Sequence, residues 1–319
     1  MIMSGYRVLY NLYFISYKKW KVSNKRIWEY VFRITVAISH RLFPTVFTRF
    51  LRNKANYRKT NPKDRNERIV ASLTTFPARI ELVWISISTI LLQSVRPDIV
   101  ELWLAKEQFP GGIESLPKSI LRLRQYGLEI CFCDDDLRSH KKYYYSMQKH
   151  PKDVVITFDD DFFYPFDSIE QVWKLHQQTP LDVIGMSTPV FTSKDLMNPL
   201  DWEMQNNAVI GMNNLGIYGG CCSLFPPCSL HTNAFDKEAI KNLAPLADDL
   251  WLTAMTYMNG KKVSSVGRIP FPVSVQDTQC EALYKINNIA TLSINNNTQW
   301  TAILDYYKEN LSEWIASVK

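Results

Sequence analysis

The sequence has few of the residues that mark small secreted, fibrous or disordered proteins. It holds six cysteines, 11 glycines and 16 prolines in 319 residues, too few for a disulfide scaffold or a low-complexity chain. The cysteines include close pairs at Cys131/Cys133 and Cys221/Cys222, and neither spacing matches a structural zinc site. We therefore expect a globular fold with reduced, mostly buried thiols.

Two nucleotide-binding signatures are also missing. No G-x-G-x-x-G follows the first predicted strand, and G-x-x-x-x-G-K-[ST] does not occur, so the glycine-rich phosphate loops of dinucleotide-binding and P-loop proteins are excluded. No apolar run reaches the ~18 residues that a membrane-spanning helix needs. We expect no signal peptide, because Lys18 and Lys19 interrupt the first apolar stretch and no small-residue cleavage site follows.

Positive charge is concentrated in one part of the chain. Residues 1–68 carry 16 Lys and Arg against three acidic residues, whereas the other 251 carry 21 basic and 28 acidic residues. Aromatic side chains are interleaved with bases over residues 6–59, which fits helices on an anionic membrane surface. Binding of nucleic acid and packing of a helical face on the rest of the protein are the alternatives. We expect the membrane surface to be the partner, and no nucleic acid.

The polar stretch 56–67 is expected to be a linker. It divides the chain into a basic, aromatic helical segment with its linker (1–67) and one larger domain (68–319). In that domain, short apolar runs alternate with segments of helical periodicity. The predicted strands cover 69–74, 99–105, 128–133 and 153–158, and the predicted helices cover 80–94, 115–126 and 139–149. This alternation predicts an α/β fold with a mainly parallel central sheet flanked by helices, which binds ligands at the carboxyl ends of its strands.

An aspartate triplet, Asp159–Asp161, follows the fourth predicted strand. Three adjacent carboxylates near a low-dielectric strand end repel one another unless a cation offsets their charge. In an extended or turn conformation Asp159 and Asp161 can point at one ion while Asp160 points elsewhere. Oxygen ligands suit Mg²⁺ or Mn²⁺, which also coordinate a diphosphate. We predict such a metal site here; an acidic turn or helix cap without metal is the alternative.

A second triplet, Asp134–Asp136, follows the third predicted strand. It is expected at the same edge of the sheet, where it can contribute to ligand binding. Capping of the next helix by Asp136 or Ser139 is an equal alternative.

These residues resemble bacterial GT-A fold glycosyltransferases of the family 2 kind. The resemblance rests on SLTTFPARI at the first strand, ITFDDDFFYP at the fourth, and GGCCSLFPP followed by APLADDLWLTAM, and it spans about residues 68–266. It implies a nucleotide-sugar half over 68–165 and an acceptor half with a tail over 166–319. The implied activity is a hexosyltransferase that moves a sugar from a nucleotide sugar, a UDP-sugar being favoured, to a saccharide or glycolipid in lipopolysaccharide or capsule synthesis.

The resemblance also implies roles for individual residues. Asp159 and Asp161 match the D-x-D metal motif, with Asp161 as the preferred direct ligand, and the run of three leaves the register open by one residue. The pair Asp248 and Asp249 matches an acidic pair beside the acceptor, with Asp249 as the preferred general base and helix capping as the alternative. The implied donor-binding residues are Thr74, Thr75, Arg79, Asp135, Asp159 and Asp160.

On the acceptor side, Gly219 and Gly220 allow close approach of the backbone to a sugar, and Trp251 is expected to stack on a sugar ring. His231 is a candidate for completing the metal shell. A base opposite the leaving group is required only for inversion, so we predict an inverting enzyme. If the acceptor is lipid-linked, the enzyme is expected in the cytoplasm, peripheral on the inner face of the plasma membrane.

Two other functions remain open from the sequence. A metal-dependent sugar-phosphate nucleotidyltransferase would want a glycine-rich basic loop after the first strand, and SLTTFPAR has no glycine. A non-catalytic membrane or nucleic-acid binding module on a transferase fold would explain the basic segment but not the acidic motifs.

Overall fold

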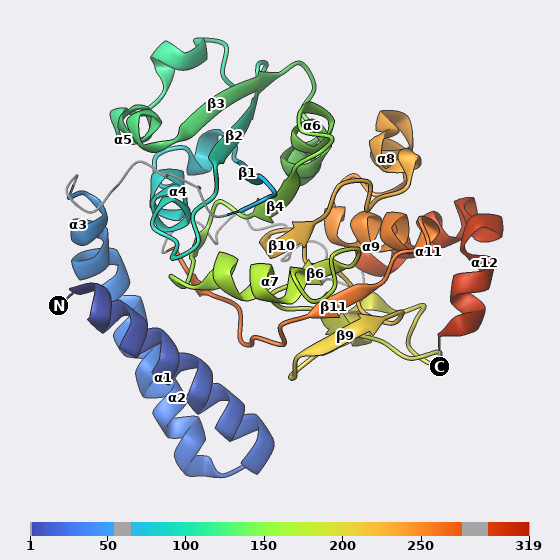
Figure 1. Cartoon of the computed structure of the whole chain (residues 1–319), viewed down its shortest axis with the longest axis horizontal. Coiled ribbons are helices and arrows are strands. Elements are labelled where there is room, and N and C mark those ends of the chain that lie inside the picture. The colour runs from blue at the N-terminus through green and yellow to red at the C-terminus, as the bar shows by residue number, and fades with distance from the viewer. Residues whose placement is uncertain (1, 54–64, 276–292, 319) are drawn as a thin grey trace.

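A computed structural model of the chain describes residues 2–53, 65–275 and 293–318. Its centre is a sheet of eight strands in the order β3-β2-β1-β4-β10-β6-β11-β9, with helices packed around it and a helical hairpin extending to one side (Figure 1). The sheet consists of β1 (Ile69–Thr74), β2 (Ile99–Ala105), β3 (Leu128–Cys133), β4 (Val154–Phe158), β6 (Val183–Gly185), β9 (Val209–Met212), β10 (Cys221–Phe225) and β11 (Val263–Ser265).

The predicted α/β fold with a mainly parallel sheet is confirmed. Strands β1, β2, β3 and β4 run parallel to one another, whereas β10 is antiparallel to both of its neighbours, β4 and β6. Strands β6 and β11 are again parallel. Since Ser72 of β1 pairs with Thr157 of β4, the loops that follow these two strands emerge side by side.

Alternate side chains of the buried strands face opposite layers of helices. Ile69 and Ala71 belong to a core shared with α4 (Val83–Leu91) and α7 (Ser168–His176). Val70 and Val155 instead pack with Met147 of α6 (Lys141–Lys149). Helix α6 therefore covers the face of the sheet opposite to α4 and α7.

Two predicted helices are shorter than their apolar periodicity indicated. The helix expected over 80–94 is ordered as α4 only, and the one expected over 115–126 is a single turn, α5 (Lys118–Leu121), continued by the 3₁₀ turn η5 (Arg122–Tyr126). Pro117 immediately precedes α5, and Gly127, with a φ of 112°, ends η5. A proline and a left-handed glycine so close together leave little room for a longer α-helix.

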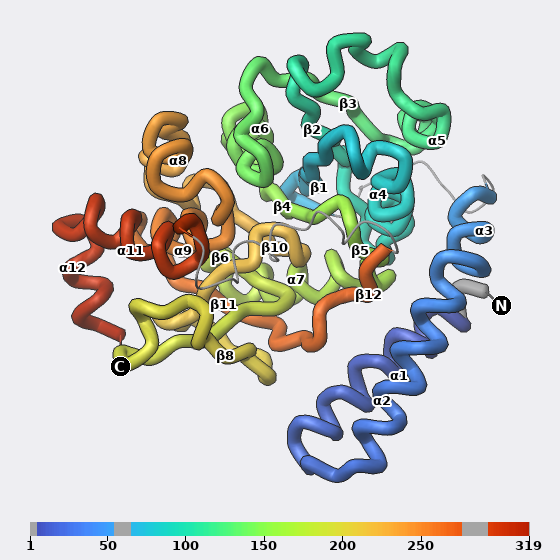
Figure 2. The backbone as a smooth tube through the Cα atoms, turned by 180° about the vertical axis from the view of Figure 1, so that it is seen from behind, coloured from blue at the N-terminus to red at the C-terminus, as the bar shows by residue number. Residues whose placement is uncertain are grey.

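The second half of the domain adds helices beside the end of the sheet that contains β6, β11 and β9 (Figures 1 and 2). Their aromatic residues Trp251, Trp300 and Trp314 are buried in one shared core. The helices are α8 (Lys237–Leu243), α9 (Asp248–Met258), α11 (Asn296–Tyr306) and α12 (Lys308–Ser317). The remaining short strands form two ribbons, β5 (Phe162–Phe163) with β12 (Val273–Ser274), and β7 (Pro189–Val190) with β8 (Glu203–Met204).

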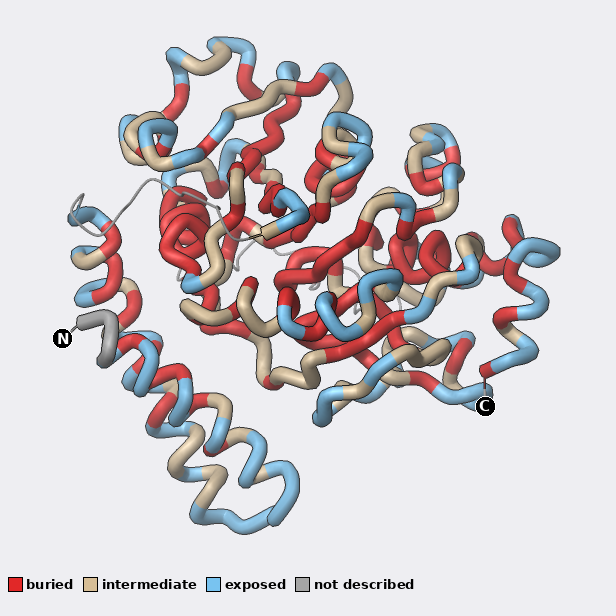
Figure 3. The backbone as a smooth tube through the Cα atoms, viewed as in Figure 1, coloured by how far each residue is buried: buried red, intermediate tan, exposed pale blue. Residues whose placement is uncertain are grey.

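The basic N-terminal segment forms two long helices, α1 (Ile2–Ser23) and α2 (Arg26–Leu42), which pair as a hairpin. Helix α2 continues through the π-helical turn η1 (Phe43–Phe47) into α3 (Thr48–Leu51). Burial is concentrated at the end of the hairpin near the domain, and exposure dominates at the turn between α1 and α2 (Figure 3). Most of the predicted linker, 56–67, lies outside the described residues.

Aromatic side chains attach the base of the hairpin to the domain. The hydroxyl of Tyr6 donates to the carbonyl of Tyr164 at 2.5 Å, and that of Tyr13 donates to the carbonyl of Phe271 at 3.2 Å. The ring of Phe43 packs on that of Phe163 with centroids 5.2 Å apart. Packing of this segment on the domain, one of the alternatives from the sequence, is thus confirmed for its buried aromatic face. Among the described helices, none is long and apolar enough to cross a membrane.

A buried glutamate fixes α6 to the sheet. Glu101, in the middle of β2, has a fully buried side chain that accepts hydrogen bonds from Ser146 at 2.5 Å, Lys149 at 2.6 Å and His150 at 2.9 Å. Burial alone would raise the pKa of Glu101, but these hydrogen bonds outweigh burial and the net pKa is below the ordinary glutamate value. The carboxylate is therefore stabilised in its charged form.

We expect Glu101→Gln to lower the free energy of unfolding by about 2 kcal/mol, because a neutral amide leaves buried donors of α6 poorly satisfied. Since the folded-state pKa is lowered, the contribution of Glu101 is present above the ordinary glutamate pKa and is lost as pH falls through the lowered value. Denaturant unfolding of both proteins at several pH values measures this. Glu129→Gln is the matched control, because Glu129 contacts the same lysine at 3.0 Å but is exposed; an equal loss in the control would contradict the prediction.

Candidate active site

Five aspartates from two distant segments meet at the carboxyl end of β4. Asp159–Asp161 follow β4 directly, and Asp248 and Asp249 form the first turn of α9. Lys142 of α6 joins the two segments: its Nζ lies 2.7 Å from Asp159 Oδ1 and 3.0 Å from Asp248 Oδ2. The Lys142 side chain is only 2% exposed, so this ammonium is a fixed component of the cluster.

Lys142 is held in this position by a hydrogen bond to its backbone and by the attraction between its charge and the aspartates. Its carbonyl accepts a 2.5 Å hydrogen bond from Ser72 of β1. Burial would lower the pKa of Lys142, but the negative charges of Asp159 and Asp248 outweigh burial and raise it, so the side chain is charged. Lys142 was not predicted from the sequence as a site residue. The available signal was its spacing, because Lys142, Ser146 and Lys149 lie three and four residues apart on one face of α6.

The other two carboxylates of the triplet are bound by the loop that follows β1. Thr75 Oγ1 donates to Asp160 Oδ2 at 2.5 Å, and Arg79 Nη1 lies 2.5 Å from Asp160 Oδ1 and 3.1 Å from Asp161 Oδ2. The structure thus brings Thr75 and Arg79 to the triplet. Thr74 is less available, because its hydroxyl donates to the carbonyl of Trp103 in β2 at 2.8 Å.

Gly219 and Gly220, which immediately precede β10, contact the aspartates through their backbone. The Gly219 N–H donates to Asp249 Oδ1 at 2.6 Å, and the Gly220 carbonyl accepts from the Asp159 N–H at 2.9 Å. A Cβ on Gly220 would lie 1.8 Å from Asp159 Cγ, and one on Gly219 would lie 2.8 Å from Asp248 Oδ2. Glycine is therefore required at both positions because the aspartate side chains lie too close to the backbone to leave room for a Cβ.

Gly220→Ala is expected to push the Asp159 carboxylate away from Lys142. Because the Asp159 side chain is 41% exposed, it can rotate toward solvent, so the fold is retained. We expect the displaced carboxylate to lower kcat by about 10²-fold. The midpoint temperature of thermal unfolding should fall by only a few degrees. Gly5→Ala is the control, since nothing lies within 4 Å of a Cβ at that exposed helical position. Unchanged turnover in Gly220→Ala would show that the position of Asp159 is unimportant.

The acidic pair on α9 is electrostatically asymmetric. For both residues burial would raise the pKa, but in Asp248 the charges of Lys142 and His140 outweigh burial and the pKa is lowered. In Asp249 burial and the adjacent negative charge of Asp248 raise the pKa well above its ordinary value. Asp248 is thus a permanently charged partner of Lys142, whereas Asp249 is the more basic carboxylate. This difference in proton affinity is typical of acid–base pairs in enzymes.

The predicted site residues Trp251 and His231 lie outside the cluster. Trp251 is completely buried, and its indole N–H donates to the carbonyl of Ala234 at 3.3 Å; its predicted stacking on an acceptor sugar is wrong. His231 immediately precedes the turn η8 (Thr232–Phe235). Its ring Nδ1 accepts from the Asn233 N–H at 3.3 Å, and its backbone N–H donates to the carbonyl of Met255. Met255 is seven residues beyond Asp248 on α9, about 10 Å along the helix, so the structure does not bring His231 to the aspartates.

The second aspartate triplet forms ion pairs with lysines. Asp135 pairs with Lys237 at the start of α8, which lowers its pKa. Asp134 lies 2.6 Å from Lys106, and Asp136 pairs with Lys141. Asp135 nevertheless remains about one-third exposed at the end of β3, on the same edge of the sheet as the main cluster.

The composition of the main cluster fits a divalent cation. Five carboxylates face two positive side chains, Arg79 and Lys142, which leaves an excess of negative charge, and all candidate ligand atoms are carboxylate oxygens. Within the described residues, three potential ligand atoms lie within 4.8 Å of one another only at Glu101, Glu129 and Cys131. There the Lys149 ammonium already contacts all three, at 2.6, 3.0 and 3.6 Å. The main cluster instead offers separate carboxylates, which suits Mg²⁺ or Mn²⁺ bound by one or two side chains together with phosphate oxygens.

No protein-family model and no curated protein matches the chain. Among solved structures, it is similar to the mannosyltransferase PcManGT from Pyrobaculum calidifontis, solved in complex with GDP-Man and Mn²⁺. That match has 13% identity and a TM-score of 0.42, and covers 90% of this chain and 86% of that one. The chain is also similar to residues 1–349 of TarS from S. aureus, with 11% identity and a TM-score of 0.41 over 77% of this chain and 72% of that one.

Proposed function

We propose that the protein is a glycosyltransferase of the GT-A kind, which transfers a sugar from a nucleotide sugar to a hydroxyl acceptor. The observation that supports this most is the meeting of Asp159–Asp161 with Asp248 and Asp249 through Lys142 at the carboxyl end of β4. Open α/β sheets bind their ligands at this end. The cluster provides both groups that the reaction needs, a site for a cation that binds diphosphate and a carboxylate of raised basicity.

On the donor side, we assign the nucleotide to the loops that follow β1 and β3. Arg79 is held by Asp160 and Asp161, while its buried Nε has no hydrogen-bond partner in the described structure. We assign to this fixed guanidinium the role of a positive charge beside the phosphates of the donor. Asp135, partly exposed at the next strand end, is the residue we assign to the base or ribose of the nucleotide.

Asp161 and Asp159 are the residues that would hold a divalent cation. Asp161 lies beside Arg79, and Asp159 is the most exposed member of the triplet, with 41% of its side chain open to solvent. When bound, Mn²⁺ or Mg²⁺ would offset the negative charge that develops on the departing diphosphate. Lys142 keeps Asp159 oriented, and Asp160 is occupied with positioning Thr75 and Arg79.

On the acceptor side, Asp249 is the residue we assign as general base. Its raised pKa results from burial and from Asp248, and the Gly219 N–H orients one of its oxygens. Such a carboxylate can take the proton of an acceptor hydroxyl as that oxygen attacks the sugar. Attack assisted by a base from the side opposite the diphosphate inverts the anomeric centre, so we propose inversion.

The proposed substrates are a nucleotide sugar, with a UDP-sugar as the first candidate, and a saccharide or glycolipid acceptor. We assign the reaction to cell-surface polysaccharide synthesis, because the domain carries an extended basic helical segment whose charge suits an anionic membrane surface.

Donor turnover tests this function directly. UDP-, GDP- and CMP-sugars are incubated with the full-length protein, with and without Mn²⁺, and released nucleotide is measured. We expect release of a nucleoside diphosphate from one donor class, dependent on the metal and abolished in Asp161→Ala. If no donor is turned over and a nucleoside triphosphate with a sugar phosphate instead yields pyrophosphate, the protein is a nucleotidyltransferase and the proposal is wrong. Turnover that survives in Asp161→Ala would likewise overturn the assigned metal site.

A further inference from the structure

The hairpin of α1 and α2 exposes aliphatic side chains along most of its length. On α1 they recur at the spacing of one helix face, and the same holds on α2. Between 44% and 75% of each side chain is exposed. These residues are Val8, Leu12, Ile15 and Val22 on α1, and Ile27, Ile34 and Ile38 on α2, where the aromatic Tyr30 is also exposed. The opposite face of α1 is used for packing, because Tyr13, Tyr17 and Trp20 all contact Phe32 of α2.

The charge of the hairpin is almost entirely positive. Residues 2–52 hold ten Lys and Arg and a single acidic residue, Glu29, which is already paired with Arg33 at 2.6 Å. Lys18, Lys19, Lys21 and the other bases of the turn are exposed. Apolar stripes bordered by lysine and arginine are the composition of helices that lie in the interface of an anionic bilayer.

The turn of the hairpin combines these lysines with tryptophan. Lys19 Nζ lies 4.2 Å from the centre of the Trp28 ring, and Lys21 Nζ lies 5.0 Å from that of Trp20. A hollow on the surface here is lined by Lys18, Lys19, Val22, Ser23 and Trp28. Tryptophan prefers the boundary between water and lipid, and two lysines beside an apolar hollow match a phosphate headgroup with its acyl chain.

We propose that the exposed apolar stripes and bordering lysines of this hairpin bind the surface of an anionic lipid bilayer. The described structure argues against a second copy of the chain as the occupant, since pairing two such hairpins would bring two strongly positive surfaces together. Nucleic acid would complement the charge but would not require the aliphatic stripes. An anionic bilayer matches both features.

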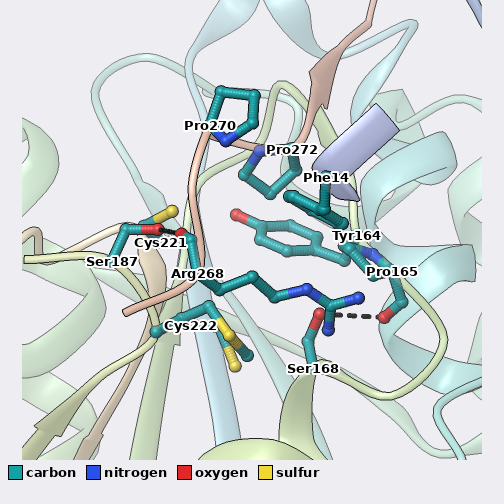
Figure 4. A pocket seen from close by; sticks show the side chains of 11 residues that line it. Phe14, Tyr164, Pro165, Ser168, Ser187, Cys221, Cys222, Arg268, Pro270 and Pro272 are labelled. Carbon is teal, nitrogen blue, oxygen red and sulfur yellow. Dashed lines mark hydrogen bonds between the residues drawn. The ribbon is translucent and has the colours of Figure 1, made fainter. Parts of the chain in front are cut away.

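The attachment of the hairpin gives this binding a consequence for the active site. Tyr6 donates to the carbonyl of Tyr164, and Phe14 lies against Tyr164 and Pro165 in a small cavity (Figure 4). The hydroxyl of Tyr164 in turn donates to the carbonyl of Gly220 at 2.7 Å and accepts from the Asp159 N–H at 2.7 Å. The bilayer-bound hairpin therefore holds the aspartate cluster in one orientation to the membrane.

Vesicle co-sedimentation of the full-length protein tests the proposal. We expect binding to vesicles with about 30 mol% phosphatidylglycerol in phosphatidylcholine, weak binding to pure phosphatidylcholine, and weaker binding as salt rises from about 0.1 M to about 0.5 M. The variant Ile15→Gln/Ile34→Gln removes two exposed aliphatic side chains without changing charge, and we expect it to bind at least about tenfold more weakly. Since both side chains are exposed, its thermal unfolding should match the wild type.

The matched control is Leu181→Gln/Ile210→Gln, which removes two equally exposed aliphatic side chains from the domain and should leave vesicle binding unchanged. A second variant, Lys18→Gln/Lys19→Gln/Lys21→Gln, should lose the preference for anionic vesicles. Wild-type binding to anionic vesicles that survives the isoleucine substitutions would overturn the proposal, and so would an absence of wild-type binding. A dimer that only the isoleucine variant loses would identify a second copy as the occupant. Tighter binding of an oligonucleotide than of vesicles, lost in the lysine variant alone, would identify nucleic acid.

Discussion

Replacing Asp249 with asparagine is expected to lower kcat for sugar transfer by about 10²–10⁴-fold, the usual contribution of a general base. The substitution preserves the shape of the side chain and an oxygen that can accept the 2.6 Å hydrogen bond from Gly219. It removes only the ability to take a proton. The thermal midpoint should change little, because Asp249 forms no ion pair among the described residues.

The pH dependence of the wild type gives an independent test of the same residue. A base acts in its deprotonated form, so activity falls as pH drops through its pKa. Because burial and the charge of Asp248 raise the pKa of Asp249 well above its ordinary value, the acidic limb of kcat/KM should lie above pH 4. In Asp249→Asn this limb should be absent from the residual activity. A variant that keeps activity within about tenfold of the wild type would exclude Asp249 as the base.

Comparing sugar transfer with donor hydrolysis distinguishes the role of Asp249 from the roles of the donor-side residues. Hydrolysis of the donor in the absence of acceptor depends on the donor site and on water, so Asp249→Asn should affect it less than transfer. Asp161→Ala should reduce both reactions. If both variants lost both reactions equally, the division of the cluster into a donor side and an acceptor side would be wrong.

The first half of the sheet could be predicted because its strands carry their own signal. Strands β1, β2 and β4 are buried over nearly every residue, which requires continuous apolar runs. Strands β6, β9 and β11 have no such signal, because they are only three or four residues long, and β10, although as long as β4, was not predicted. β10 also changes register at Cys222, where φ is 60°. Their order in the sheet is determined by tertiary contacts.

The aspartates of the site could be identified from the sequence because they follow a strand or begin a helix. Their cationic partners could not. Lys142 is separated from Asp159 by 17 residues and from Asp248 by 106, and the fold brings its ammonium to both carboxylates. Trp251 shows the opposite error. It follows the acidic pair in sequence, but it is completely buried and packs in the core with Trp300.

Replacing Lys142 with methionine should have the largest effect on folding of any substitution in the site. Methionine has a similar length but no charge, so Asp159 and Asp248 would face each other without the ammonium that now lies 2.7 and 3.0 Å from them. Removing one partner of a buried ion pair commonly costs about 3–5 kcal/mol of unfolding free energy. Asp159 can turn toward water, but the Asp248 side chain is only 9% exposed and cannot.

Lys141→Met is the matched control, since Lys141 is equally buried but pairs with Asp136 alone, which is more exposed than Asp248. We expect a smaller loss there, about 1–2 kcal/mol.

The pH dependence of the stability has a definite sign. Lys142 and His140 lower the pKa of Asp248 in the wild type, so this stabilisation is present above the ordinary aspartate pKa and is lost as pH falls through the lowered value. The deficit of Lys142→Met measured by denaturant unfolding should therefore shrink below about pH 4. A deficit that equals that of Lys141→Met at pH 7, or that grows on acidification, would show that Lys142 does not hold the two aspartate segments together.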